Sequence, residues 1–473
     1  MLFNSLDYAL FLPTVFLLYW FVFKSNLKIQ NLFLLLASYF FYACWNWKFL
    51  ALIILSTLIN YYLGKWISAN PQNSKFFLWV GIILNLVILG FFKYYNFFIE
   101  NFIEMFRIFG TELNITPLKI ILPIGISFYT FQGISYLTDV YRKNFKPSDN
   151  LLSFSIFITF FPQLVAGPIE RASDLLPQIN NKRIFNYNQA ITGLKLIALG
   201  LFEKIVIADN CAVFVNAIFD DYASESGSTL FFGAVLFSFQ IYGDFCGYSH
   251  IAIGSANLLG FNLTKNFNYP YLAQNIADFW RRWHISFSYW LRDYIYFPLG
   301  GSKQGEYRKI KNLTIVFLIS GIWHGADWTF VIYGAIHALL YIIFIYYRKW
   351  TRNIRVFSSK LTDTLYDFIA IVSTFVILTI ARVFFRAESY SESMSYLKRM
   401  LSESLFEKPN ISRFFIVSLF GFLILEWLQK DKEHLLDLSD IKSKILRHLI
   451  YLGVVFMIFF YSSNNQSFIY FQF

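Results

Sequence analysis

The sequence contains little charge for its length. Only 15% of its 473 residues are Asp, Glu, Lys or Arg, against about 25% in ordinary soluble domains. A soluble chain of this size would form about two or three domains, each with alternating apolar and polar faces. Apolar blocks follow one another almost end to end instead. No soluble domain is expected, and therefore no basic face that could bind nucleic acid.

Cysteine is also scarce, and no internal repeat stands out in the sequence. The three cysteines (Cys44, Cys211 and Cys246) lie far apart within apolar segments, without zinc spacing or a CxxC pair. Buried packing is their expected role. No two histidines have ligand spacing on one helix and no carboxylate cluster accompanies them, so no metal is expected. The lack of a repeat disfavours the inverted-repeat architecture of many transporters.

What the sequence does contain is long apolar runs, with 57% hydrophobic residues and 58 phenylalanines. The first run, 7–23, has no preceding basic region and no cleavage site, so we expect a retained first span. Runs of about 17–25 residues are long enough to cross a membrane. They are 7–23, 29–45, 48–64, 76–98, 118–140, 188–208, 229–260, 312–347, 365–385, 412–428 and 446–463. The expected fold is an all-α polytopic membrane protein, a single domain over 1–473 with about 11 or more transmembrane helices.

The loop charges predict the orientation of the chain. With the N-terminus outside, the early inside loops hold seven basic residues and the early outside loops three. The inside residues are Lys24, Lys28, Lys65, Lys75, Arg142, Lys143 and Lys146. The outside residues are Lys48, Arg107 and Lys119. This imbalance predicts an external N-terminus, and the net charge of +11 suits contact with anionic lipid or an anionic cytosolic substrate.

One polar motif, SGIWHGADWTF, interrupts the apolar block 312–347. Basic clusters flank the block, so both of its ends are expected at the cytoplasmic side. The 12 residues from Asn312 to His324 would rise about 18 Å as a helix, in a hydrocarbon core about 30 Å thick. The chain should therefore reach mid-depth near His324 and turn back or break at 325–327, which membranes tolerate only inside protein or beside a wet cavity.

An ionisable residue at that depth is a candidate for function. A neutral imidazole can accept a proton, as a general base must. The alternative for His324 is a histidine that is hydrogen-bonded in the core and holds two helices together.

A second segment, 277–301, carries too many charges to span a membrane. As one helix, it would place its aromatic residues on a single arc and its arginines off that arc, which is typical of a helix in the membrane interface. His284 would lie at the edge of the arc, where a packed interfacial histidine is the simpler interpretation. The arginines could hold phosphates, although contact with lipid headgroups is again simpler.

These two segments also carry a family resemblance. FWRRWHISFSYWLRDYIYFPLGGSK and GIWHGADWTFVIYGAIHA resemble the two signature regions of the membrane-bound O-acyltransferase family, and most closely its bacterial polysaccharide branch. Further blocks at 122–142, 160–179 and 241–261, and the ending FIYFQF, are similar to that branch as well. The resemblance implies re-entrant and interfacial helices around a central cavity, in a bacterial cytoplasmic membrane.

The resemblance also implies roles for particular residues. His324 occupies the position of the catalytic histidine of the family, and His284 that of a second characteristic histidine. Candidate substrate-binding residues are Trp323, Arg281, Arg282 and Asp293; pairing with a neighbouring arginine is the simpler role for Asp293. His250 departs from the branch, which often carries an acidic residue there.

The implied chemistry is acyl transfer across the membrane. An acetyl group would come from a cytosolic thioester, with acetyl-CoA as donor and no bound cofactor. It would pass, with an extracytoplasmic partner of the SGNH-hydrolase type, to a polysaccharide. His324 would take the proton of an incoming hydroxyl, while His284 or a backbone group orients the acyl chain or stabilises the oxyanion. D-alanyl transfer to teichoic acid, or a proton-coupled transporter or exporter, remain alternatives.

Overall fold

The computed structural model describes residues 1–351, 360–462, 466, 468 and 469, and within these ranges the chain is helical without a strand. This confirms the all-α class. Six helical stretches in the described ranges are long and apolar enough to cross a membrane. They are Leu27–Ala69, Pro71–Ile108, Gly227–Leu258, Trp328–Thr351, Thr364–Arg386 and Lys444–Tyr461, with shorter apolar helices at Leu6–Val22 and Phe415–Leu428. The count of about 11 spans stays a prediction.

The described chain divides into two compact units, although the prediction from the sequence was one domain. The N-terminal unit comprises Met1–Leu194 with Ala252–Thr264, and the second comprises Lys195–Ile251 with Lys265–Phe473. The division follows the pattern of contacts and leaves the prediction of a single functional domain open. Both histidines of the candidate site belong to the second unit.

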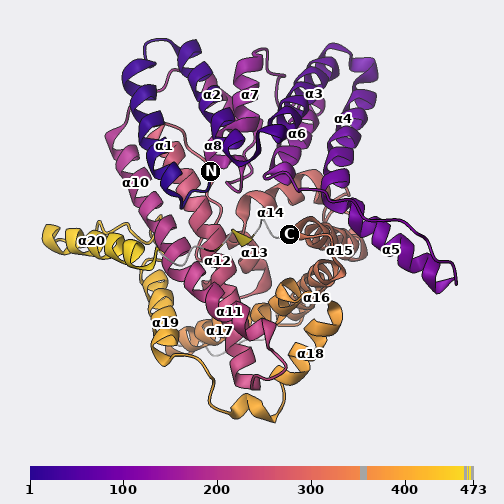
Figure 1. Cartoon of the computed structure of the whole chain (residues 1–473), viewed down its shortest axis with the longest axis vertical. Coiled ribbons are helices and arrows are strands. Elements are labelled where there is room, and N and C mark those ends of the chain that lie inside the picture. Colours follow the sequence, from indigo (N-terminus) through magenta and orange to yellow (C-terminus); the bar gives the residue numbers. More distant parts are fainter. Residues whose placement is uncertain (352–359, 463–465, 467, 470–473) are drawn as a thin grey trace. The chain divides into compact units, whose positions relative to one another are not determined.

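The N-terminal unit is a bundle of helices. Its helices are α1 (Leu6–Leu17), η1 (Leu18–Val22), α2 (Leu27–Asn46), η2 (Trp47–Phe49), α3 (Leu50–Ala69), η3 (Pro71–Asn73), α4 (Ser74–Leu89), η4 (Gly90–Tyr94), α5 (Tyr95–Ile108), α6 (Ile126–Tyr141), α7 (Leu151–Thr159), α8 (Phe161–Leu164), α9 (Ala172–Asn180) and the start of α10 (Tyr187–Leu201). Helices α3, α4 and α6 pack pairwise, side by side (Figure 1). Paired amides join α3 to α4, where Asn85 Nδ2 donates to Asn60 Oδ1 at 2.9 Å. Such polar pairs stabilise helix association in an apolar environment.

The expected span 118–140 is wrong in its first part. The structure begins helix α6 only at Ile126, and residues 111–123 have no regular structure. Pro117 and Pro123 disfavour a helix through this stretch. Gly125 adopts the left-handed conformation (φ 76°) immediately before the helix begins.

The second unit contains the remaining helices. They are η5 (Phe202–Ala208), α11 (Asp209–Asp220), α12 (Gly227–Leu258), η6 (Pro270–Leu272), α13 (Ile276–Arg282), α14 (Ile285–Leu291), η7 (Arg292–Tyr296), α15 (Gly305–His324), α16 (Trp328–Thr351), α17 (Lys360–Arg386), α18 (Tyr390–Met400), η8 (Glu403–Phe406), α19 (Arg413–Leu428) and α20 (Lys444–Tyr461). The last residues of α12 belong to the N-terminal unit. Of the cysteines expected to be buried, Cys211 and Cys246 are buried, but Cys44 is exposed.

The expected break at 325–327 is present between α15 and α16, which pack against each other as a hairpin (Figure 1). Their crossing is close because two glycines face each other, with Gly321 on α15 and Gly334 on α16. Helix α15 begins at Gly305, seven residues before the start taken for the depth argument, although those seven residues include the charged GEYRKIK segment. The mid-depth position of His324 stays a prediction.

Segment 277–301 is not one helix. It is divided into α13, α14 and the π-helical turn η7, with a break at Trp283 and His284. His284 has φ 44° and ψ 56°, the left-handed conformation, which a continuous right-handed helix cannot contain. The single aromatic arc expected for this segment is therefore wrong.

Candidate active site

His284 is held at the break between α13 and α14 by a residue from an earlier loop. Asn266 is 18 residues upstream, and its backbone carbonyl accepts the amide N–H of Ile285 at 2.9 Å. Its side-chain Oδ1 accepts from Ser286 N at 3.3 Å and from Ser286 Oγ at 2.9 Å. Since a left-handed residue is costly outside glycine, these bonds account for the position of the histidine.

The same side chain determines which nitrogen of His284 carries the proton. Asn266 Oδ1 can only accept, and it lies 3.1 Å from His284 Nδ1. Nδ1 therefore donates, and Nε2 has a free lone pair and no hydrogen-bond partner among the described residues. Burial lowers the pKa of His284 to about 3, so the imidazole is neutral at physiological pH.

His324 is the last residue of α15 and is 4% exposed. The ring of Phe287 lies 5.0 Å from the ring of His284 and 6.3 Å from that of His324, centre to centre. Trp323 stacks on Phe287 at 4.1 Å and lies 5.6 Å from His284. Phe385 of α17 lies 5.1 Å from His324. The structure thus brings both predicted histidines and Trp323 into one buried aromatic cluster.

Asp327 of the motif SGIWHGADWTF stabilises the start of α16. Gly325 is extended (φ −162°) and ends α15. A Cβ there would lie 2.1 Å from the ring of Phe330, so only glycine fits. Asp327 Oδ1 then accepts the backbone N–H of Thr329 at 2.7 Å at the start of α16. This is the role of a helix cap.

One buried charged residue near the cluster was not predicted from the sequence. Arg382 is 1% exposed, and its guanidinium carbon lies 5.0 to 5.5 Å from the ring centres of Tyr271, Phe279 and Trp283. A charged residue in the apolar run ARVFF was the available signal.

His337 of α16 is a third histidine near this cluster. It is 1% exposed and lies 4.4 Å from the ring of Tyr333, which is itself 6.0 Å from His324. The ring of Tyr333 therefore lies between His337 and His324.

A cavity of about 250 Å³ opens beside this cluster. It is lined by Trp280, Ser288, Leu291, Arg292, Tyr296, Lys309, Leu313, Val316, Phe317, Ser320 and Tyr341. Ser320 is one helical turn before His324 on α15, and Arg292 and Lys309 supply positive charge. Such a cavity combines an apolar wall with cationic groups suited to phosphate.

The cavity is not lined by any of the residues predicted to bind substrate, which are Trp323, Arg281, Arg282 and Asp293. Arg281 is exposed and does not line the cavity. Arg282 Nε pairs with Asp278 at 3.0 Å, and Asp293 takes two contacts from Arg292, at 2.7 and 3.2 Å. The pairing of Asp293 with a neighbouring arginine is the simpler role foreseen for it. Arg292 and Lys309 line the cavity, whereas Arg281 and Arg282 do not; of the two lining cations, Arg292 is already paired with Asp293.

This polytopic helical protein, with a histidine pair at two helix breaks, belongs to the membrane-bound O-acyltransferase (MBOAT) family. Residues 147–386 match the family description, and it is therefore an O-acyltransferase. The peptidoglycan O-acetyltransferase of Helicobacter pylori is 38% identical over 432 residues, covering 85% of this chain and 80% of that protein. The probable alginate O-acetylase AlgI of Pseudomonas aeruginosa is 36% identical over 423 residues, covering 89% and 78%.

A more distant relative has a different acyl group in its name. The teichoic acid D-alanyltransferase of Bacillus subtilis is 30% identical over 275 residues, covering 55% of this chain and 67% of that protein. Family membership agrees with the predicted enzyme class and weighs against the transporter alternative.

Proposed function

We propose that this protein takes an acetyl group from a cytosolic thioester, acetyl-CoA, and passes it across a bacterial cytoplasmic membrane for O-acetylation of an extracytoplasmic polysaccharide. The observation that carries the proposal is the convergence of His284 and His324 on Phe287. The names of the relatives with 36% and 38% identity support an acetyl group and a glycan acceptor. The early loop charges support an external N-terminus.

In the proposed reaction, the oxygen of an incoming hydroxyl attacks the thioester carbonyl and His324 takes the hydroxyl proton. The carbon–sulfur bond then breaks, and the departing thiolate takes the proton from His324, which returns the histidine to its neutral form. The ester formed on the hydroxyl is the product. No side chain of the protein becomes acylated in this scheme.

The hydrogen bond from His284 Nδ1 to Asn266 argues against His284 as the group that stabilises the oxyanion. Oxyanion stabilisation requires an N–H donor aimed at the oxyanion. The one N–H of His284 points to Asn266, and Nε2 carries a lone pair. His284 is therefore proposed to orient the reacting groups, while the oxyanion donor is a backbone N–H.

The cavity supports an anionic donor. Arg292 and Lys309 line it within a largely apolar wall, as binding of a phosphate-bearing thioester would require. We propose that the donor enters here, with its acyl end toward Ser320 and His324. The acceptor hydroxyl is proposed to belong to an extracytoplasmic SGNH-type partner, which passes the acetyl group to the polysaccharide.

The test is thioester consumption by the purified protein in nanodiscs, followed as thiol released from acetyl-CoA. His324→Ala and His284→Ala are compared with His448→Ala, an exposed histidine on α20, and each variant is checked by thermal melt. General-base catalysis contributes about 10²- to 10⁴-fold to the rate, so folded His324→Ala should lose turnover by at least about 100-fold. Undiminished turnover in His324→Ala would remove the base from the proposal.

The second candidate function is D-alanyl transfer, which the teichoic acid relative favours. It is tested by offering the same protein a carrier protein loaded with D-alanine. Turnover with that donor and none with acetyl-CoA would replace the acetyl proposal and leave the histidine roles intact.

A further inference from the structure

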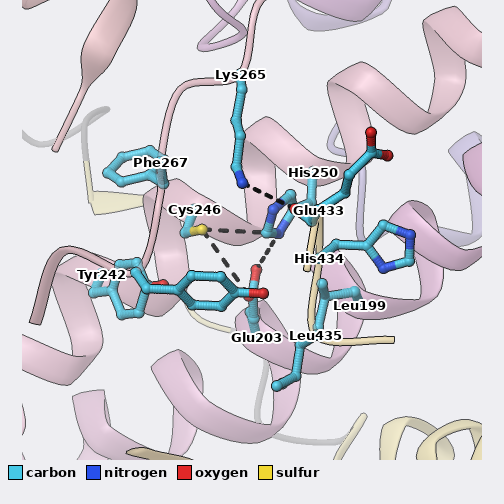
Figure 2. Close-up of a pocket in the computed structure, with 11 residues that line it drawn as sticks. Leu199, Glu203, Tyr242, Cys246, His250, Lys265, Phe267, Glu433, His434 and Leu435 are labelled. Atoms are coloured by element: carbon cyan, nitrogen blue, oxygen red, sulfur yellow. Dashed lines mark hydrogen bonds and ion pairs between the residues drawn. The ribbon is translucent and has the colours of Figure 1, made fainter. Parts of the chain in front are cut away.

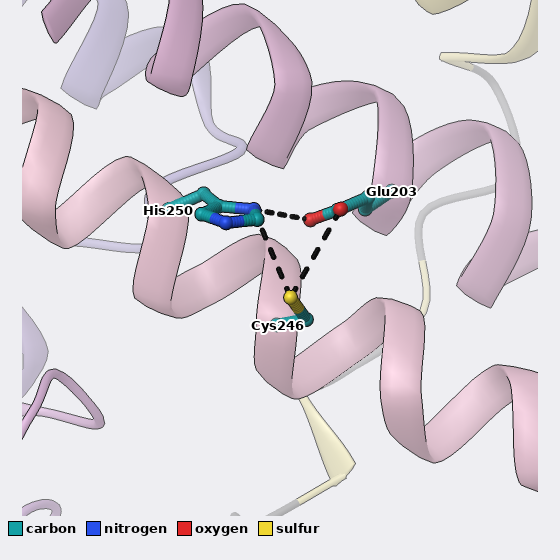
Figure 3. A group of neighbouring side chains, drawn as sticks. All are labelled: Glu203, Cys246 and His250. Carbon is teal, nitrogen blue, oxygen red and sulfur yellow. Dashed lines mark hydrogen bonds and ion pairs between the residues drawn. The ribbon is translucent and has the colours of Figure 1, made fainter. Parts of the chain in front are cut away.

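A second group of chemically active side chains, apart from the candidate active site, lies on α12 and η5. Cys246 and His250 are one helical turn apart on this helix, and Glu203 faces them from the π-helical turn η5 (Figure 3). The distance from Glu203 Oε2 to His250 Nδ1 is 2.7 Å, from Cys246 Sγ to His250 Nδ1 3.7 Å, and from Cys246 Sγ to Glu203 Oε1 4.0 Å. The side chains of Glu203 and His250 are 3% and 12% exposed. Three ligand-type atoms thus meet in a nearly buried triangle.

The arrangement does not fit a nucleophile–base–acid relay. Such a relay uses both ring nitrogens of the histidine, one for the nucleophile and the other for the carboxylate. Here the sulfur and the carboxylate both face the same nitrogen, Nδ1. Covalent catalysis by Cys246 is therefore not what this geometry serves.

The spacing does fit ligands around one metal ion. Zinc bonds of about 2.0–2.3 Å at tetrahedral angles place neighbouring ligand atoms about 3.4–3.6 Å apart. The observed separations, 2.7 to 4.0 Å, bracket these values. Shifts of less than an ångström would bring the three atoms to one ion. Thiolate, imidazole and carboxylate are the ligands that zinc accepts.

A small cavity adjoins the triangle and leaves a position for a fourth ligand. It has a volume of about 10 Å³, on the order of one water molecule. Figure 2 shows that Glu203, Cys246, His250 and His434 all line it. His434 is 6% exposed, and its Nδ1 has no hydrogen-bond partner among the described residues.

Lys265 also lines this cavity and is the group that would oppose a cation. Its Nζ donates to Asn268 Oδ1 at 3.0 Å and to the carbonyl of Glu433 at 2.9 Å, so it is directed to other partners.

We propose that Glu203, Cys246 and His250 form a binding site for a divalent transition metal of the zinc type, with the fourth coordination position in the cavity beside His434. Binding replaces the Glu203–His250 hydrogen bond by two bonds to the metal, and the thiol of Cys246 loses its proton to solvent. The ion would join η5 to α12.

Because α12 also supports the active site, through the bond from Asn266 Nδ2 to Ser249 Oγ at 3.2 Å, the site would brace the helix behind His284.

The test is a cobalt titration of the full chain in detergent, after chelation and removal of any affinity tag that binds metal. A cobalt–thiolate bond gives a near-ultraviolet charge-transfer band that cobalt bound by nitrogen and oxygen alone lacks. The chain has three cysteines, so Cys44→Ser/Cys211→Ser leaves Cys246 as the only thiol. This double variant should keep the band at one equivalent of cobalt, and Cys246→Ser should lose it.

Zinc content by mass spectrometry and cobalt affinity provide independent readouts. Changes to groups behind a ligand already cost about 10- to 100-fold in metal affinity, so Glu203→Gln should weaken cobalt binding by at least about 100-fold. The absence of the band in the folded double variant would overturn the proposal. A band of equal strength in Cys246→Ser would also overturn it. If Cys246→Ser does not fold, the double variant decides alone, because its band can arise only from Cys246.

Discussion

The crossing of α15 and α16 offers a test of how the position of His324 is maintained. A Cβ added at Gly334 would lie 2.4 Å from the carbonyl oxygen of Phe317 and 3.2 Å from the Cα of Gly321. Ordinary van der Waals contact begins at 3.4 Å, so Gly334→Ala must separate the helices by about 1 Å at this point. Overpacking of this kind costs about 1–3 kcal/mol. A displacement of about 1 Å at a reacting group can lower the rate about 100-fold.

We therefore expect Gly334→Ala to lower kcat/KM for the thioester about 100-fold, with a reduced Tm but a folded protein. The assay is thiol release by the purified variant, paired with a thermal melt. The matched control is Gly421→Ala in α19, where an added Cβ meets nothing within 4 Å. Wild-type turnover in Gly334→Ala would refute the view that close helix packing positions His324. An equal loss in Gly421→Ala would show that the assay reports helix substitution in general.

Three further predictions concern buried polar groups. Burial raises the pKa of Glu170 from 4.5 to about 7, so the folded state favours the protonated carboxyl, and the stability this adds is complete below about pH 4.5 and lost by about pH 7. Glu170→Gln, which stays neutral, should therefore raise Tm more at pH 8 than at pH 5, and an equal shift at both pH values would contradict this. Lys204 pairs with two buried carboxylates at 2.7 Å each, so Lys204→Met should destabilise the protein by about 3–5 kcal/mol, whereas Lys303→Met, at an exposed site, should leave the melt unchanged. Asn266→Ala removes the acceptor that fixes the tautomer of His284, and should lower turnover at least about 10-fold with folding retained; unchanged turnover would count against that role.

Features that depend on neighbours in sequence were predictable. The break at 325–327 was expected from the basic clusters that flank block 312–347 and from the helical rise to His324, and the structure places it there. The helical class follows from apolar runs of membrane length. The first part of span 118–140 failed because two prolines and a glycine outweighed apolarity.

Features that depend on distant residues were not predictable. The break at His284 is maintained by Asn266, whose bonds reach the start of a helix about 20 residues later. Cys246 and His250 suggest no site until Glu203 meets them, and that residue is 43 positions away from the cysteine. Helical periodicity describes each segment alone, so it cannot predict hydrogen bonds between residues that are distant in sequence.

The two histidines can be ranked by the helix ends on which they lie. His324 is the last residue of the 20-residue helix α15, and a helix C-terminus carries about −0.5 of an elementary charge. That partial charge favours the imidazolium that forms when a base takes a proton. His284 lies between the C-terminus of α13 and the first residue of α14, so the two helix dipoles oppose each other there, and its burial disfavours a second proton. Both histidines contact Phe287, so one substrate could meet both, yet only His324 is itself the last residue of a helix, where the imidazolium formed by proton transfer is stabilised. This asymmetry supports His324 as the base and a neutral His284 as the residue that orients the reacting groups.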